Sequence, residues 1–160
     1  MASSSLELLK NQIYSEENIQ QVVDLIIIGA VENGSSDIHI EPLTSNVRLR
    51  YRLDGILREI LEYQPFLHPQ IVARIKIMSN MKIDESRIPQ DGRLSTTISG
   101  KPLDLRVSTL PTVHGEKIVM RIVDKSKKIP TIDELWVEWH NRDLLLKAIN
   151  EPNGIVLTSG

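Results

Sequence analysis

A change in the spacing of apolar residues near residue 35 constrains the fold of this chain most strongly. Across residues 19–30 the apolar side chains recur every three or four positions, which predicts a helix with one buried face. Ser15 is the expected N-cap of that helix, Glu16 and Glu17 suit its first turn, and Gly34 ends it. In residues 37–42 the spacing becomes two, as expected for a half-buried strand. The sequence therefore predicts an α+β fold.

The same two patterns continue along the chain. Residues 47–53 and 56–61 alternate as strands and are joined by Asp54-Gly55, a strong hairpin signal. A second helix follows Pro65, and its apolar side comprises Ile71, Ile75 and Met78. We expect further short strands at 93–98, 103–108 and 117–123.

The chain divides near residue 124. Residues 124–130 are charged, lack an apolar period and end in proline, which is typical of a linker. A helical pattern and then the apolar run 155–157 follow, and the run leads into Ser159-Gly160. We expect a flexible leader at 1–14, an α+β domain at 15–123, a linker at 124–131, and the start of a second domain at 132–160.

Composition excludes several classes of protein. The chain has no cysteine, so it has neither disulfides nor thiolate metal sites, in agreement with a reducing compartment. Its net charge is −2 and only 4% of its residues are aromatic, so a nucleic-acid groove is not expected. No apolar run is long enough to span a membrane. No serine shares a motif with a histidine and an acid, which leaves no signal for an enzyme that acts unaided.

Two charged stripes lie on the early strands. Asp37, His39 and Glu41 share one strand face, but neighbours on such a face lie about 7 Å apart, too far for one metal ion without bending. The alternative is a solvated or partner-facing side, and we expect no metal. The second stripe can bind phosphate, pair with acids of a partner or remain solvated, and it consists of Arg48, Arg50 and Arg52.

Three arginines on the later strands form the most suggestive set. Arg93 follows Gln90-Asp91-Gly92, Arg106 lies in Leu-Arg-Val-Ser, and Arg121 lies in Val-Met-Arg. If their strands are neighbours, the guanidinium groups come within reach of one anion, and their planar forks suit phosphate. The alternative is three independent surface salt bridges, each of which stabilises little.

Taken in order, the motifs resemble those of the secretion ATPase superfamily, which comprises type II secretion motors, type IV pilus assembly motors and competence relatives. The resemblance covers residues 17–160 and is carried by the segments 35–42, 50–55, 87–93, 105–125 and 151–160. Trp136 and Trp139 depart from it, because relatives often have a Leu-Gly helix start there.

The resemblance implies a PAS-like N-terminal domain with an antiparallel sheet and flanking helices, flexibly joined to a RecA-like ATPase domain. Gly160 would then be the first glycine of the phosphate-binding loop, with its lysine and hydroxyl residue beyond the chain. The acidic box, Walker B and the histidine box would also lie beyond it. We therefore expect no catalysis and no cofactor for this chain alone, whereas the parent would use ATP with magnesium.

The resemblance also implies a homohexamer, in which Arg93 and Arg106 reach the γ-phosphate of ATP held by a neighbouring subunit. Arg121 would lie near the nucleotide or the hinge. The parent would be cytoplasmic, peripheral to the inner membrane, and would move platform proteins there. The resemblance does not distinguish secretion from pilus extension, pilus retraction or competence. The alternative is an autonomous PAS-type module that binds a ligand or a protein.

Overall fold

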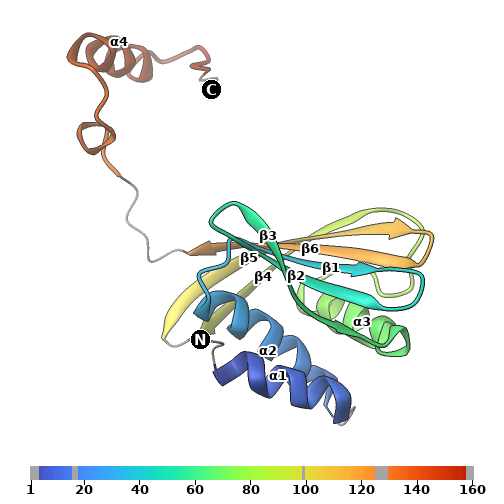
Figure 1. Ribbon diagram of the computed structural model, residues 1–160. Helices are drawn as coiled ribbons and strands as arrows, with labels where there is room; N and C mark the ends of the chain where they lie inside the picture. The colour runs from blue at the N-terminus through green and yellow to red at the C-terminus, as the bar shows by residue number, and fades with distance from the viewer. Residues whose placement is uncertain (1–3, 16–17, 99, 125–129, 158–160) are drawn as a thin grey trace. The chain divides into compact units, whose positions relative to one another are not determined.

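The computed structural model describes residues 4–15, 18–98, 100–124 and 130–157 (Figure 1). The helices are α1 (Ser4–Ser15), α2 (Ile19–Glu32), α3 (His68–Met78) and α4 (Trp139–Ile149), with short 3₁₀ turns at Pro65–Leu67 and Asp133–Leu135. The strands are β1 (Asp37–Pro42), β2 (Val47–Leu53), β3 (Ile56–Tyr63), β4 (Gln90–Ile98), β5 (Lys101–Thr112) and β6 (Gly115–Asp124). The chain forms two compact units, Met1–Ser126 and Lys127–Gly160.

The strands of the first unit form one sheet in the order β3-β2-β1-β6-β5-β4. Every neighbouring pair is antiparallel. Hairpins join β2 to β3, β4 to β5 and β5 to β6, whereas the pairing of β1 with β6 joins residues far apart in the sequence. The predicted α+β class is confirmed, and the open antiparallel sheet is consistent with a PAS-like domain.

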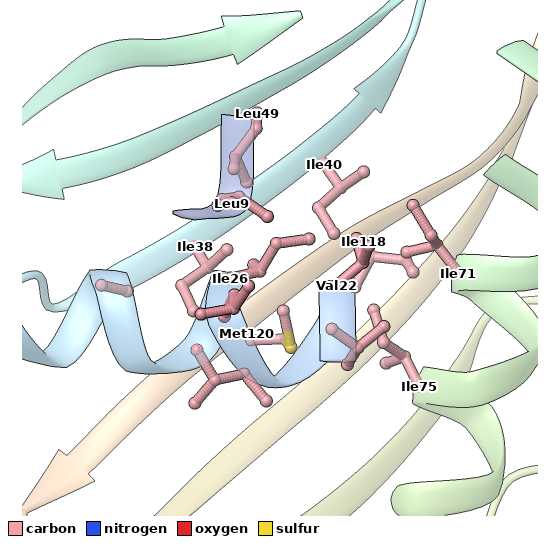
Figure 2. Packing of buried hydrophobic residues seen from close by; sticks show 14 of the residues in the cluster. Leu9, Val22, Ile26, Ile38, Ile40, Leu49, Ile71, Ile75, Ile118 and Met120 are labelled. Atoms are coloured by element: carbon pink, nitrogen blue, oxygen red, sulfur yellow. The ribbon is translucent and has the colours of Figure 1, made fainter. Parts of the chain in front are cut away.

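One face of the sheet carries the core. Figure 1 shows α1, α2 and α3 on the same side of the sheet, and Figure 2 shows aliphatic side chains of helices and strands packed together there. Burial of this apolar surface is the main force that holds the unit together. The fully buried side chains include Leu9, Ile26, Ile38, Ile40, Leu49, Ile71, Ile75 and Ile118.

The N-terminal segment differs from our expectation of a flexible leader. Residues 4–15 form α1, because Leu6, Leu9 and Ile13 recur at helical spacing and bury one face. The next helix does not begin at Ser15, which is the last residue of α1. Instead Asn18 caps α2, and its side chain accepts a hydrogen bond of 3.1 Å from the backbone N–H of Gln21.

The second unit contains the expected helix, α4, but no strand at 155–157 within its described residues. Ile155 is 84% exposed and Leu157 is 87% exposed. The predicted linker falls largely on residues 125–129, and Gly160 falls at the C-terminus; both lie outside the described residues. Among the helices that the structure describes, none is long and apolar enough to cross a membrane.

Candidate functional site

The three arginines singled out from the sequence lie side by side on neighbouring strands. Arg93 in β4 is directly opposite Arg106 in β5, and Arg106 is directly opposite Arg121 in β6. Side chains of directly opposed residues share one face of a sheet, with Cβ atoms about 4.5–5.5 Å apart. We call Arg93, Arg106 and Arg121 the arginine row.

The strand alternation places this row on the face away from the core. In β5 the neighbours of Arg106, Leu105 and Val107, are 0% and 1% exposed, so they point inward and Arg106 points outward. In β6 the same holds for Met120, which is 0% exposed and precedes Arg121. All three arginines of the row are exposed.

Two members of the row have no acidic partner in the part of the chain that the structure describes. Within the described residues, Arg93 and Arg106 make no ion pair, although they oppose each other directly. Like charges in directly opposed positions destabilise a sheet. An anion that bound both guanidinium groups would relieve this repulsion, so the arrangement favours a binding role over the alternative of three independent salt bridges.

Two shallow hollows flank Arg106. One, of about 240 Å³, lies beside Arg93, and the other, of about 250 Å³, lies beside Arg121. Ser108 lines both hollows and donates a hydrogen bond of 2.5 Å to Asp91. Each hollow is smaller than the roughly 300–1,000 Å³ typical of small-molecule sites. Each therefore suits one part of a ligand, such as a phosphate group, with the rest held by another surface.

The row continues from Arg121 to an acid. Asp37 in β1 is directly opposite Arg121 and, on its other side, Arg52 of β2. Its carboxylate accepts from Nε of Arg121 at 2.9 Å and lies 3.2 Å from Nε of Arg52. Burial alone would raise the pKa of Asp37, but the hydrogen bonds from Arg121 and Ser36 and the two guanidinium charges outweigh it and lower that pKa.

Glu41 occupies a similar position four residues further along β1. Its carboxylate binds Nη2 of Arg50 at 2.6 Å and Nζ of Lys117 at 2.8 Å, and His39 Nδ1 lies 3.9 Å away. Burial would raise the pKa of Glu41, but the bonds to Lys117 and Arg50 lower it. The pKa of His39 is lowered by burial and by the charge of Lys117.

The charged stripes of β1 and β2 pair largely with each other and with acids of β3. Among the residues that the structure describes, no group of three potential ligands is placed to hold a metal ion. Arg50 and Arg52 pair with the acids of β1, and Arg48 lies 3.0 Å from Glu59 and 3.1 Å from Glu62. The stripe of β2 is therefore neutralised by acids of its own domain.

Sequence reasoning missed the partnership of Asp37 with Arg121. The two residues are 84 positions apart, and their contact depends on the pairing of β1 with β6. The available signal was the alternation of opposite charges at matching phase in two predicted strands. That signal becomes specific only once the strand order is known.

The family model described as "Type II/IV secretion system protein" matches residues 12–160. The chain belongs to this family. The resemblance stated from the motifs is thereby confirmed, and the arginine row lies within the matched residues.

Curated relatives support the same assignment. The type II secretion system ATPase E of Vibrio cholerae is 40% identical over 142 residues, which cover 89% of this chain. The type II secretion system protein E of Xanthomonas campestris is 40% identical over 99% of the chain. The type IV pilus assembly ATPase PilB of Acinetobacter baylyi is 39% identical over 94% of it. The chain spans only 28%, 28% and 26% of these relatives' lengths, respectively.

Proposed function

We propose that this chain is the N-terminal domain of a hexameric motor ATPase that drives type II secretion or type IV pilus assembly or retraction. In this proposal Arg93 and Arg106 act on ATP bound by a neighbouring subunit. The observation that carries the proposal is the arginine row, in which two directly opposed guanidinium groups lack acidic partners among the described residues. Family membership and the names of the relatives support it.

The chemistry of the row fits the γ-phosphate. Each guanidinium donates two parallel N–H groups to phosphate oxygens, and it stays charged at any physiological pH. During transfer of the phosphoryl group, negative charge is spread over its three equatorial oxygens. Arginines placed in advance stabilise that charge without reorganisation, as arginine fingers do in other NTPases.

The row supplies charge but neither a nucleophile nor a metal ligand. The Walker lysine, the magnesium ligands and the residue that orients the attacking water would come from the RecA-like domain of the neighbouring subunit. We therefore expect this chain alone to lack ATP turnover. Gly160 would belong to the phosphate-binding loop of its own subunit.

Coupling to the machine would follow from the two compact units. Contact of the row with ATP would fix the first unit of one subunit against the nucleotide domain of the next, and product release would free it. The resulting motion, with its hinge near residues 124–131, would act on platform proteins of the inner membrane. The motor would work in the cytoplasm at the inner membrane.

Arginine substitutions in the full-length protein test the proposal. We expect Arg93→Ala and Arg106→Ala each to lower ATP turnover by on the order of 10³-fold, as for arginine fingers elsewhere. Arg48→Ala is the control, because it removes an arginine of the same sheet face that already has acidic partners. Wild-type turnover by intact hexamers of both row variants would contradict the proposal.

A mixing experiment tests whether the row acts in trans. The chain is added to the separately expressed remainder of the protein, and ATP turnover is measured before and after. We expect turnover to rise on mixing and the rise to be absent with Arg93→Ala. Turnover by the chain alone would mean that it contains a complete active site.

The second candidate is an autonomous PAS-type binding module. A hollow of about 480 Å³ between α3 and the β5–β6 hairpin supports it, because that volume falls within the roughly 300–1,000 Å³ of small-molecule sites. His68, Lys76 and Glu116 line this hollow but already contact one another or neighbouring backbone. Native mass spectrometry of the purified chain decides the matter, since a co-purified ligand would favour the module.

A further inference from the structure

Asp37 is the acid at the end of the arginine row, and it is nearly inaccessible to solvent. It is 4% exposed, whereas the side chain of Arg121, its direct neighbour across β1 and β6, is 68% exposed. A carboxylate that is buried against an exposed guanidinium can orient it without reaching a ligand itself. Asp37 is therefore placed to act on the site through Arg121.

Both oxygens of the Asp37 carboxylate have partners. Oδ1 accepts from Nε of Arg121 at 2.9 Å. Oδ2 accepts from the hydroxyl of Ser36 at 2.8 Å and lies 3.2 Å from Nε of Arg52. With contacts on each side, the carboxylate is fixed in position, and charge-assisted hydrogen bonds of this kind are stronger than neutral ones.

The contact uses only one edge of the Arg121 guanidinium. Nε faces Asp37, and the two terminal nitrogens have no hydrogen-bond partner among the described residues. Those terminal nitrogens carry four of the five N–H donors of an arginine. They can form the fork that binds two oxygens of a phosphate. The hollow beside Arg121 is lined by Asp37, Arg106, Ser108, Val119 and Arg121 itself.

We propose that Asp37 is a positioning residue that holds Arg121 in the arginine row as a third contact to the phosphates of ATP. It acts through Arg121: Asp37 lines the hollow beside Arg121, but Arg121, Ser36 and Arg52 already engage both of its carboxylate oxygens. This inference rests on the proposed function of the row. The three arginines then differ in what positions them. Strand pairing places Arg93 opposite Arg106, whereas a buried acid also holds the guanidinium of Arg121.

Neutralising Asp37 changes ATP turnover in opposite directions depending on whether Asp37 positions Arg121 or only contributes negative charge. If Asp37 influenced the site only through its negative charge, its neutralisation would make the site more positive and would favour ATP. If Asp37 orients Arg121, its neutralisation weakens the hydrogen bond and releases the guanidinium. Positioning therefore predicts a loss where charge alone predicts a gain.

Steady-state ATP turnover by the full-length protein provides the test. We expect Asp37→Asn to lower kcat/KM about tenfold, because the charge-assisted hydrogen bond becomes a neutral one. We expect Arg121→Ala to lower it at least as much. In the double variant the two losses should not multiply, and kcat/KM should stay within about twofold of that of Arg121→Ala. A wild-type or higher value for Asp37→Asn, or multiplied losses in the double variant, would overturn the inference.

Glu41 offers a matched control. It lies on the same strand and face, it also binds two cations, and its side chain is 14% exposed, compared with 6% for Asp37. Glu41→Gln should therefore disturb folding in a similar way but leave kcat/KM within about twofold of wild type. Equal losses for both variants would mean that the effect is general to the sheet, and the inference would fail.

A lysine variant keeps the inference testable even where Asp37→Asn does not fold. Arg121→Lys retains a positive charge beside Asp37 but cannot present a planar fork. If the fork is what binds ATP, this variant keeps the melting temperature of the wild type but loses turnover nearly as far as Arg121→Ala. Wild-type turnover by Arg121→Lys would reduce the pair to a structural ion pair.

The outcomes also separate this inference from the proposed function. Wild-type turnover in Arg93→Ala and Arg106→Ala removes the function of the row, and the role of Asp37 with it. Impaired row variants together with an unimpaired Asp37→Asn leave the row intact and remove Asp37 alone.

Discussion

At the scale of single residues, buried charge in the first unit is stabilised by partners from neighbouring elements. Lys76 of α3 is 1% exposed, and its ammonium group lies 2.7 Å from the Glu116 carboxylate and donates to the backbone carbonyl of Glu85 at 2.8 Å. The side chain therefore ties α3 to the start of β6 and to the loop that leads into β4. This loop leads into the strand that contains Arg93, so the pair also helps to position the first strand of the arginine row.

Breaking this pair should destabilise the domain strongly. We expect Lys76→Met to lower the free energy of unfolding by about 3–5 kcal/mol, because it leaves the Glu116 carboxylate buried without its cation. The double variant Lys76→Met/Glu116→Met should recover most of that loss, since two apolar side chains replace the pair. Urea denaturation followed by circular dichroism measures both.

The control for this experiment is Lys117→Met. Lys117 pairs with Glu41 but its side chain is 32% exposed, so about 1 kcal/mol or less is expected. A single Glu116→Met variant completes the cycle. If the losses of Lys76→Met and Glu116→Met simply add in the double variant, the two residues are not coupled.

His68 makes the stability of the domain depend on pH near neutrality. It is 4% exposed, its Nε2 lies 2.7 Å from the carbonyl oxygen of Glu116, and its Nδ1 lies 3.0 Å from the hydroxyl of Tyr63. A carbonyl only accepts, so Nε2 carries the proton of the neutral ring. Burial lowers the pKa of His68 below its ordinary 6.5, although the contact with Glu116 opposes this.

A histidine with a lowered pKa stabilises the fold above its unfolded pKa and loses that contribution as the pH falls. The unfolded chain binds the proton first, so we expect the free energy of unfolding to decrease as the pH falls below 6.5. His39, whose pKa is also lowered by burial, contributes in the same direction. The contributions of Asp37 and Glu41 are lost only at lower pH, below their unfolded values of 3.8 and 4.5.

Urea denaturation at pH 7.5, 6.5 and 5.5 checks this expectation. The decrease should be smaller in His68→Gln, whose side chain does not titrate, whatever the effect of that substitution at pH 7.5. A stability that is constant or rises toward pH 5.5 would contradict the buried neutral histidine.

At the scale of elements, the sequence predicted the strands and turns that show a clear local pattern of apolar and turn residues. The strands at β2, β3 and β5 follow from alternation, and the hairpin at Asp54-Gly55 follows from its turn residues. Strand ends were less predictable: β5 continues to Thr112 and β4 begins at Gln90 because pairing with neighbours extends them. The sequence predicted that the three arginines of the row lie on neighbouring strands. The contact of Asp37 with Arg121 depends on the pairing of β1 with β6, which no local pattern specifies.

Helix α1 shows what was missed when the N-terminus was expected to be a flexible leader. Adjacent leucines in this helix differ completely in burial: Leu9 is 0% exposed and Leu8 is 51% exposed. We expect Leu9→Ala to lower the free energy of unfolding by about 2–5 kcal/mol, because it leaves a cavity in the core. Leu8→Ala should change it by less than about 0.5 kcal/mol.

The comparison isolates packing from helix propensity, because both substitutions put the same residue into the same helix. Chemical denaturation of the two variants under identical conditions gives the difference directly. Equal effects of the two substitutions would mean that α1 does not pack on the domain and that its residues behave as a leader.

At the scale of the whole molecule, the two units differ in what stabilises them. All the buried apolar residues described belong to the first unit, from Leu6 to Met120. The described residues of the second unit are exposed or half-buried, and Trp136 and Trp139 are 92% and 78% exposed. An element with little buried apolar contact contributes little to cooperative stability. The first unit supplies all of its described core residues itself, so we expect it to fold without the second.

The positions of the tryptophans turn this into a measurement. The chain has 2 tryptophans, and both lie in the second unit. We expect a chain that ends at residue 126 to show the same urea transition by circular dichroism as the full chain, since no core residue is lost. Circular dichroism reports on the first unit, and tryptophan emission reports on the second, where both tryptophans lie. A shortened chain that is less stable or that loses its cooperative transition would contradict the expectation that the core of the first unit is sufficient for its folding.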